Sequence, residues 1–132
     1  MKLSELRGKV VIVNFWTYGC INCIRNLPHY RKWHAQLPRD RAAMVAFHTP
    51  ETEAEFDVTK IKRAAKEKSL DYPIAVDNQK ENWSAWGNSV WPSVYLIDKQ
   101  GYVRYWWYGE LNWQGAAGEA KMLERVYQLM RE

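Results

Sequence analysis

Two mostly apolar runs dominate the pattern of hydrophobic and polar positions along this chain of 132 residues. Residues 10–16 (VVIVNFW) and 42–48 (AAMVAFH) are apolar at nearly every position. A strand that is buried on both faces has this pattern, whereas a strand with one solvent face alternates apolar and polar residues. The pattern therefore predicts two central strands of a sheet that is covered on both sides.

Charged and helical segments separate and follow these runs. Residues 20–37 are predicted as a helix, bent at Pro28 because proline lacks the N–H and clashes with the preceding turn. Strands at 94–98 and 102–108 flank residues 99–101 (KQG), which form a hairpin signal. The other predicted elements are helices at 52–69, 78–86 and 116–131 and a short strand at 74–76. This order predicts one α/β domain with a mixed sheet.

The first apolar run leads directly into a pair of cysteines. After Trp16 come a short polar turn and then Cys20-Ile21-Asn22-Cys23 at the start of the predicted helix. The unpaired N–H groups and the dipole of a helix N-terminus stabilise a thiolate, which is the reactive form of cysteine. We therefore expect Cys20 to attack a disulfide, and Cys23, one helical turn later, to resolve the mixed disulfide.

The segment VVIVNFWTYGCINCIRNLP (residues 10–28) resembles the active-site segment of thioredoxin-like proteins. It is most similar to the TlpA/ResA-like branch and to DipZ-type C-terminal domains. Pro28 matches the proline of the first helix in that fold, and Trp91-Pro92-Ser93 followed by VYLIDKQGYV resembles its cis-proline loop and closing hairpin. The resemblance implies a thioredoxin-like three-layer α/β/α sandwich with a central mixed sheet, in which residues 50–77 form the helix and strand insertion of TlpA-like proteins. We expect a single domain over residues 1–132, excised from a longer or tethered protein.

The same resemblance implies a thiol–disulfide oxidoreductase that needs no cofactor beyond its redox-active disulfide, and a role in cell redox homeostasis. Its partners would be protein thiols and disulfides, with a membrane-bound DsbD-like electron donor and an exported protein or apocytochrome as substrate. It implies a periplasmic or other extracytoplasmic location, with a membrane tether in the full-length protein. Pro92 is expected to be cis and to face the cysteines, where the backbone of Trp91 pairs with an extended substrate peptide. Trp16 and Gly19 complete the predicted substrate surface.

Three positions depart from the family pattern. Asn14 stands where thioredoxins place a buried Asp, and Asn26 stands where ResA-like proteins carry a Glu. Neither familiar carboxylate is therefore available to take the proton from Cys23. His48 is the candidate proton shuttle because imidazole titrates near neutral pH, and a histidine packed at the edge of the core is the alternative. Gly19 replaces an aromatic residue that many relatives carry before the first cysteine, which should loosen or expose the sulfur.

A zinc site is the structural alternative for the two cysteines, with His29 and His34 as the other ligands. Zinc fingers leave about twelve residues between the cysteine and histidine pairs, whereas these histidines follow Cys23 on the same predicted helix. We therefore expect no metal site, and we expect both histidines on the outer turns of that helix.

Two other classes of protein stay open. Thioredoxin-fold peroxidases share the position of Thr17, but their pattern also requires a proline where this chain has Val13. A non-catalytic thioredoxin-like binding module of a multidomain protein is the second class. The adjacent Trp106 and Trp107 must face opposite ways on a strand, and one of them, if exposed, would dock a partner domain or a sugar. Packing in the core and on the sheet face is the alternative for these rings.

Charge and hydropathy exclude other functions. The formal net charge is +4, but most of the lysines and arginines alternate with acidic residues, as on a solvated helix face rather than a nucleic-acid-binding stripe. No run approaches the ~18 apolar residues of a membrane span, and the N-terminal segment lacks the apolar region of a signal peptide.

Overall fold

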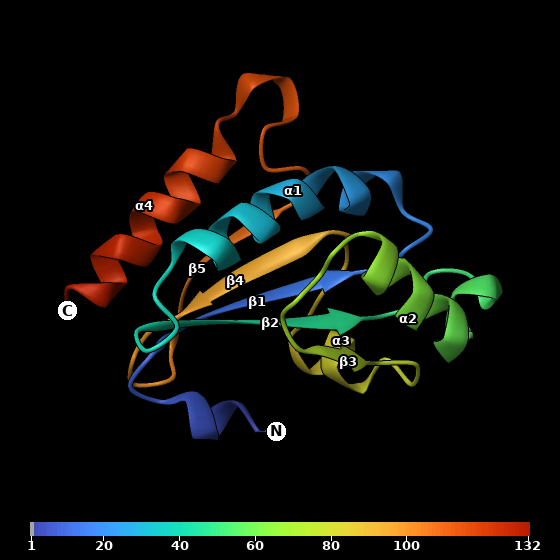
Figure 1. Cartoon of the computed structure of the whole chain (residues 1–132), viewed down its shortest axis with the longest axis horizontal. Helices are drawn as coiled ribbons and strands as arrows, with labels where there is room; N and C mark the ends of the chain where they lie inside the picture. The colour runs from blue at the N-terminus through green and yellow to red at the C-terminus, as the bar shows by residue number, and fades with distance from the viewer. Residues whose placement is uncertain (1) are drawn as a thin grey trace.

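A mixed sheet of five strands forms the centre of the computed structural model, which describes residues 2–132. Its order is β3-β2-β1-β4-β5, with β1 parallel to β2, β2 parallel to β3, and β4 antiparallel to both β1 and β5 (Figure 1). The strands are β1 (Val10–Trp16), β2 (Ala42–His48), β3 (Ile74–Val76), β4 (Ser93–Ile97) and β5 (Val103–Tyr108). The predicted strands are confirmed within a residue at each end.

Four α-helices surround this sheet. They are α1 (Ile21–Gln36), α2 (Val58–Glu67), α3 (Glu81–Ala85) and α4 (Gly118–Met130), with short 3₁₀ helices η1 (Leu3–Leu6), η2 (Glu53–Phe56) and η3 (Trp113–Gly115). The prediction of one helix over 52–69 is wrong. Asp57 separates η2 from α2, because its carboxylate caps α2 by accepting hydrogen bonds from the Thr59 and Lys60 N–H groups. Within residues 2–132, no helix combines the length and the apolarity that a bilayer span requires.

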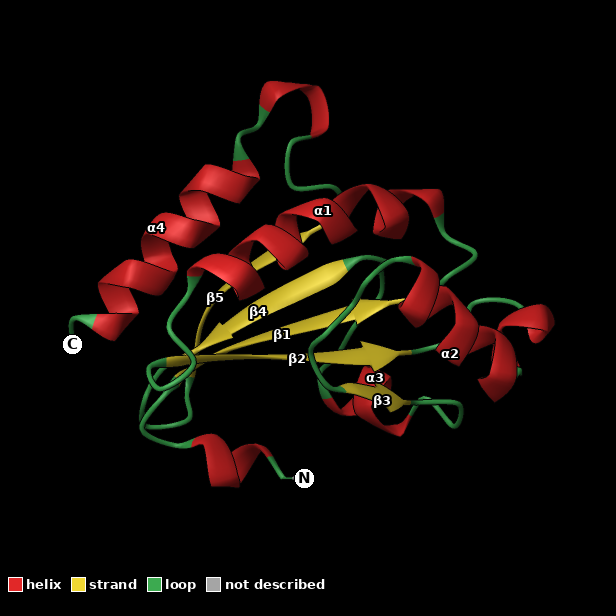
Figure 2. Ribbon diagram, viewed as in Figure 1, coloured by secondary structure: helices red, strands yellow, loops and turns green. Residues whose placement is uncertain are grey.

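The two faces of the sheet are covered by different helices. Side chains alternate along a strand, so Ile12 and Trp16 of β1 lie on one face, with α1 and α4, while Val13 and Phe15 lie on the other. Figure 2 shows α1 and α4 on one side of the sheet and α3 on the opposite side, where η1 also packs. This is the predicted three-layer α/β/α sandwich.

The segment predicted as a TlpA-like insertion adds η2, α2 and β3 between β2 and α3. Its strand extends the sheet, since β3 pairs in parallel with the last residues of β2. Its 3₁₀ helix η2 follows the carboxyl end of β2 directly and so lies at the same end of the sheet as the start of α1 (Figure 1).

The β4–β5 hairpin contains one irregularity. The pairing shifts by a residue between Leu96 and Ile97, so that Arg104 has no direct partner on β4. The Arg104 guanidinium bonds the carboxylates of Asp98 (3.1 Å) and Glu132 (2.7 Å). Further along β5, Trp106 is exposed and Trp107 is half-buried, which confirms that the two rings face opposite ways.

Candidate redox site

The two cysteines lie where β1 ends and α1 begins. Cys20 is the N-cap of α1, and its Sγ accepts a hydrogen bond of 3.2 Å from the Cys23 N–H. The Cys20 N–H in turn donates to the Thr17 carbonyl. Both cysteines are free thiols, Cys20 half-buried and Cys23 fully buried. The predicted placement of a CxxC at a helix N-terminus is confirmed.

These surroundings give the two thiols opposite acidities. Hydrogen bonds from the Cys23 thiol and N–H lower the pKa of Cys20 to about 7, although partial burial and the nearby Glu51 carboxylate act in the opposite direction. Burial raises the pKa of Cys23 far above its usual range, and the neighbouring Cys20 adds to the effect. Near neutral pH a large share of Cys20 is therefore thiolate while Cys23 holds its proton.

The cis-proline loop lies beside this turn. The Trp91–Pro92 peptide bond is cis, as predicted. β1 pairs Phe15 with Ser93, so Pro92 lies next to Trp16 at the end of the sheet from which the cysteine turn departs. The Trp91 indole donates to the Thr49 carbonyl (2.9 Å). The ring also stacks on Trp83 at 3.8 Å between centroids.

Trp16 does not belong to the substrate surface, and that prediction is wrong. Its side chain is fully buried on the face of the sheet that α1 covers, where its ring packs edge-on against His48. The backbone of Gly19, by contrast, is exposed, and Cys20 beside it is half-buried. Trp16 therefore packs beneath the site, whereas Gly19 is open to a substrate.

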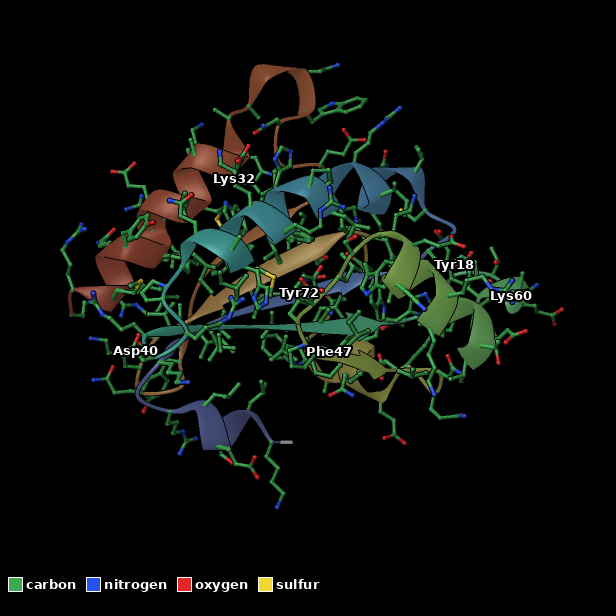
Figure 3. All side chains as sticks on the ribbon, in the orientation of Figure 1. Tyr18, Lys32, Asp40, Phe47, Lys60 and Tyr72 are labelled. Atoms are coloured by element: carbon green, nitrogen blue, oxygen red, sulfur yellow. The ribbon has the colours of Figure 1, made fainter. Side chains whose placement is uncertain are left out.

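His48 fixes the turn from the end of β2. Its Nε2 accepts a hydrogen bond of 3.1 Å from the Tyr18 N–H and lies 3.3 Å from the Thr17 hydroxyl. The Tyr18 ring stacks on the imidazole; Figure 3 labels Tyr18 at this end of the molecule and Asp40 at the other. Burial lowers the pKa of His48 to about 4, so the ring is neutral near pH 7. This geometry fits the packed histidine, and the proton shuttle stays a prediction.

Glu55 is the site residue that the sequence analysis missed. It lies on η2 with 4% of its surface exposed, and its carboxylate accepts hydrogen bonds from the Thr17 hydroxyl, the Thr52 hydroxyl (2.6 Å) and the Glu51 N–H (3.1 Å). Burial would raise the pKa of Glu55, but these hydrogen bonds outweigh it and hold the pKa below the usual range. Thr52 and Glu55 have the spacing of a capping box. This pattern indicates the helical turn at residues 52–55, but it does not indicate that Glu55 contacts Thr17.

Asn26, at the position of the missing glutamate, holds a loop instead. Its side chain donates to the Gly109 carbonyl (3.1 Å) and accepts from the Leu111 N–H (2.9 Å). It thereby attaches the loop after β5 to the second turn of α1. Asn14, the other departure from the family pattern, is fully buried in β1. Neither residue provides a carboxylate, as the sequence indicated.

The two histidines of α1 contact other residues than the cysteines. His29 Nδ1 is 2.8 Å from a Glu119 carboxylate oxygen on α4, and the His34 ring packs edge-on against Tyr72. Over residues 2–132, no cluster of three or more His, Cys, Asp or Glu side chains is placed to hold a metal ion. Both histidines are half-buried rather than on the outermost surface.

Comparison with known proteins relates this site to a family. The model of the AhpC/TSA family matches residues 1–106. The chain belongs to this family. Within it, protein DipZ of Mycobacterium tuberculosis is 41% identical over 108 residues, which are 82% of this chain and 16% of DipZ. The thiol-disulfide oxidoreductase YkuV of Bacillus subtilis is 30% identical over 125 residues, 94% of this chain and 79% of YkuV.

Solved structures agree with this assignment. The thioredoxin-like superfamily protein SPOA0173 superposes with a TM-score of 0.88 at 26% identity, over 100% of this chain and 86% of that protein. The predicted thioredoxin fold and its TlpA-like relatives are thus confirmed, and relatives named as thiol-disulfide oxidoreductases support that class of enzyme. The AhpC/TSA chain described here spans about a sixth of the DipZ sequence.

Proposed function

We propose that this AhpC/TSA-family chain is a thiol–disulfide oxidoreductase that reduces disulfides in proteins through Cys20 and Cys23. The observation that supports it most is the division between the thiols. Cys20 is half-exposed, with its sulfur bonded by the α1 N-terminus, and Cys23 is buried one turn away. Two-step disulfide exchange requires one thiol that a partner can reach and a second, protected thiol that later resolves the mixed disulfide.

The reaction needs only the dithiol. The Cys20 thiolate attacks one sulfur of a substrate disulfide, which forms a mixed disulfide and releases the other substrate sulfur as a thiol after protonation. Cys23 then loses its proton and attacks the Cys20 sulfur, and the second substrate thiol leaves. Two electrons and two protons pass to the substrate, and the protein keeps a Cys20–Cys23 disulfide, which a partner must reduce.

Protein substrates fit the surroundings of Cys20. The cis Trp91–Pro92 peptide immediately precedes β4 beside the cysteine turn, where an extended substrate segment would pair with the Trp91 backbone. The TlpA-like resemblance supports the further proposal of a membrane-bound DsbD-like donor as the reductant, exported proteins as substrates, and a reaction outside the cytoplasm. A tether for this domain then belongs to the full-length protein.

The peroxidase alternative has less support. A peroxidase needs hydrogen-bond donors beside the reactive sulfur for the peroxide oxygen, and Thr17 would be such a donor. The Thr17 hydroxyl instead donates to Glu55. This residue therefore serves the turn rather than a peroxide.

The test is the reduction potential of the pair, measured by equilibration with glutathione and alkylation of free thiols. A value near the −270 mV of thioredoxin, within about 50 mV, supports a reductase, and one near about −120 mV marks an oxidant. If no reversible Cys20–Cys23 disulfide forms, the oxidoreductase proposal is wrong and the binding-module alternative takes its place. Catalysed reduction of insulin disulfides by the intact chain is the matching activity assay.

A further inference from the structure

The segment of residues 51–55 is fastened to the turn that carries the cysteines. Glu55 makes this connection, since its carboxylate bonds the Thr17 hydroxyl on one side and the Glu51 N–H and Thr52 hydroxyl on the other. The carboxylate is almost fully buried and every one of these contacts donates to it. A buried carboxylate with three donors is stable in its ionised form, so it brings a fixed negative charge to the turn.

Gly19 makes room for this carboxylate. A Cβ at position 19 would collide with Oε2 of Glu55 and come within 3.0 Å of its Cδ. Gly19 does not occupy the left-handed backbone region, so the turn itself would accept another residue. A side chain at position 19 would therefore have to displace the Glu55 carboxylate, and this close approach favours glycine here. This explains the departure from the family pattern, where the sequence alone suggested only a looser sulfur.

We propose that Glu55 is a positioning residue of the redox site, which holds residues 51–55 against the turn so that acidic charge faces Cys20 and Cys23 and keeps the pair reducing. The inference deepens the proposed reductase function and rests on it. Glu55 acts through Thr17 and Glu51 rather than by contact with sulfur. In this role it holds in place, within the TlpA-like insertion, the negative charge of Glu51, whereas positions 14 and 26 carry no carboxylate.

The electrostatic surroundings of the sulfurs agree with this role. Glu55 holds the main chain of Glu51 through the Glu51 N–H. The carboxylate of Glu51 raises the pKa of both Cys20 and Cys23. Of the other ionisable groups near the turn, His48 is neutral near pH 7. On the side of α1, Arg25 is paired with Glu110 at 3.0 Å. Glu51 is thus the charged side chain, outside the cysteine pair itself, that acts on both sulfurs.

Negative charge beside the pair favours the disulfide over the dithiol whenever the dithiol carries a thiolate. The thiolate is destabilised by the charge, whereas the disulfide carries no charge to repel. A pair whose thiolate is destabilised gives up its electrons more readily, as the contrast between thioredoxin and the oxidant DsbA illustrates. Removing the Glu55 carboxylate, which holds the Glu51 segment against the turn, should therefore make this protein less reducing.

The experiment compares Glu55→Gln with the matched control Glu53→Gln, which removes the same charge from an exposed position of the same 3₁₀ helix. Two quantities are measured on the intact chain: the pH midpoint of Cys20 alkylation and the equilibrium constant with glutathione. For Glu55→Gln we expect a lower midpoint and an equilibrium shifted three- to tenfold toward the dithiol, where tenfold equals about 30 mV. Glu53→Gln should shift both by less than half as much.

Gly19→Ala provides an independent variant, because it leaves Glu55 in the chain and only displaces its carboxylate. It should move both quantities in the same direction as Glu55→Gln, and it should add nothing in a Glu55→Gln background. A loss of packing alone would weaken the bonds to the Cys20 sulfur and raise the alkylation midpoint, which is the opposite sign. If the alkylation midpoint of Glu55→Gln rises, or equals that of Glu53→Gln, the inference about Glu55 is wrong. The proposed oxidoreductase function would still stand in that case, provided that the unaltered chain forms a reversible Cys20–Cys23 disulfide.

Discussion

Cys20 lies at the cap of α1 with part of its side chain in solvent, whereas Cys23, one turn further along, has no exposed surface. The first sulfur accepts hydrogen bonds, and the second residue donates them. As a result the pKa of Cys20 falls to about 7 while burial raises that of Cys23. Two identical side chains in one four-residue motif thus differ in role: Cys20 is the nucleophile, and Cys23 is the resolving thiol.

The roles of the two cysteines therefore depend on their positions along the helix rather than on the motif itself. The helix N-terminus presents its N–H groups to the residue that precedes it, so only Cys20 receives their partial positive charge. The next turn points its side chain into the core between α1 and the sheet, and there Cys23 loses contact with water. Four measurements test this difference between the two thiols.

Replacing the exposed thiol has the largest expected effect. Cys20→Ser removes the thiol that a substrate disulfide reaches from solvent, since Cys23 is fully buried, so catalysed reduction of insulin should fall to the uncatalysed rate. The turnover of insulin disulfides is the measurement, with circular dichroism to confirm the fold. Residual activity above about a hundredth of the original would contradict the assignment of Cys20 as the attacking residue.

Replacing the buried thiol should stop the reaction one step later. Cys23→Ser keeps the attack by Cys20 but removes the group that resolves the mixed disulfide. We expect a covalent complex with the substrate that accumulates in mass spectrometry and dissociates with dithiothreitol. The same treatment of Cys20→Ser should yield no adduct. If both variants trap substrate equally, the two thiols are interchangeable, and the assignment of Cys20 as nucleophile and Cys23 as resolving thiol is wrong.

The pH dependence separates the two thiols without a mutation. Because the pKa of Cys20 is lowered to about 7, its alkylation rate should rise with pH, reach half its maximum near pH 7, and fall about tenfold for each unit below pH 6. Cys23, whose pKa is raised, should react slowly across this range. Iodoacetamide labelling followed by peptide mapping gives both rates, and a half-maximum above pH 8.5 would mean that the α1 N-terminus leaves Cys20 unaltered.

The smallest expected effect concerns the side-chain bonds by which Asn26 attaches the loop after β5 to α1, the helix that carries both cysteines. Asn26→Ala leaves the Gly109 carbonyl and the buried Leu111 N–H without their partner, which should lower the free energy of unfolding by about 1–3 kcal/mol. Urea denaturation measures it. Asn22→Ala, the same change at an exposed position of α1, should cost under about 1 kcal/mol. The Cys20 alkylation midpoint should stay in place in both variants, since neither removes a bond to sulfur.

Local patterns in the sequence were enough for much of this architecture. The buried strands, the cysteine-bearing helix and the hairpin follow from periodicity and from turn residues that lie within a few positions of one another. The CxxC and Trp91–Pro92 were likewise found as short motifs. These features depend on interactions close in sequence, and a single chain displays them directly.

The contacts that complete the site span long separations, and the sequence analysis did not find them. Thr17 and Glu55 are 38 positions apart, and nothing in a run of exposed glutamates distinguishes the one that folds inward. Trp16 was misplaced for another reason. It is close to Cys20 in sequence, but strand alternation puts its side chain on the same face as Ile12, beneath α1.

The register shift at Arg104 has a consequence beyond the hairpin. An outer strand offers unpaired backbone groups to any other extended chain, and one rich in aromatic residues, as β5 is, invites such pairing. The shift interrupts the even spacing of those groups, and the guanidinium puts a charge among them. At the opposite border β3 has only three residues to offer. The sheet therefore ends at both sides in a form that resists intermolecular strand addition and the aggregation that begins with it.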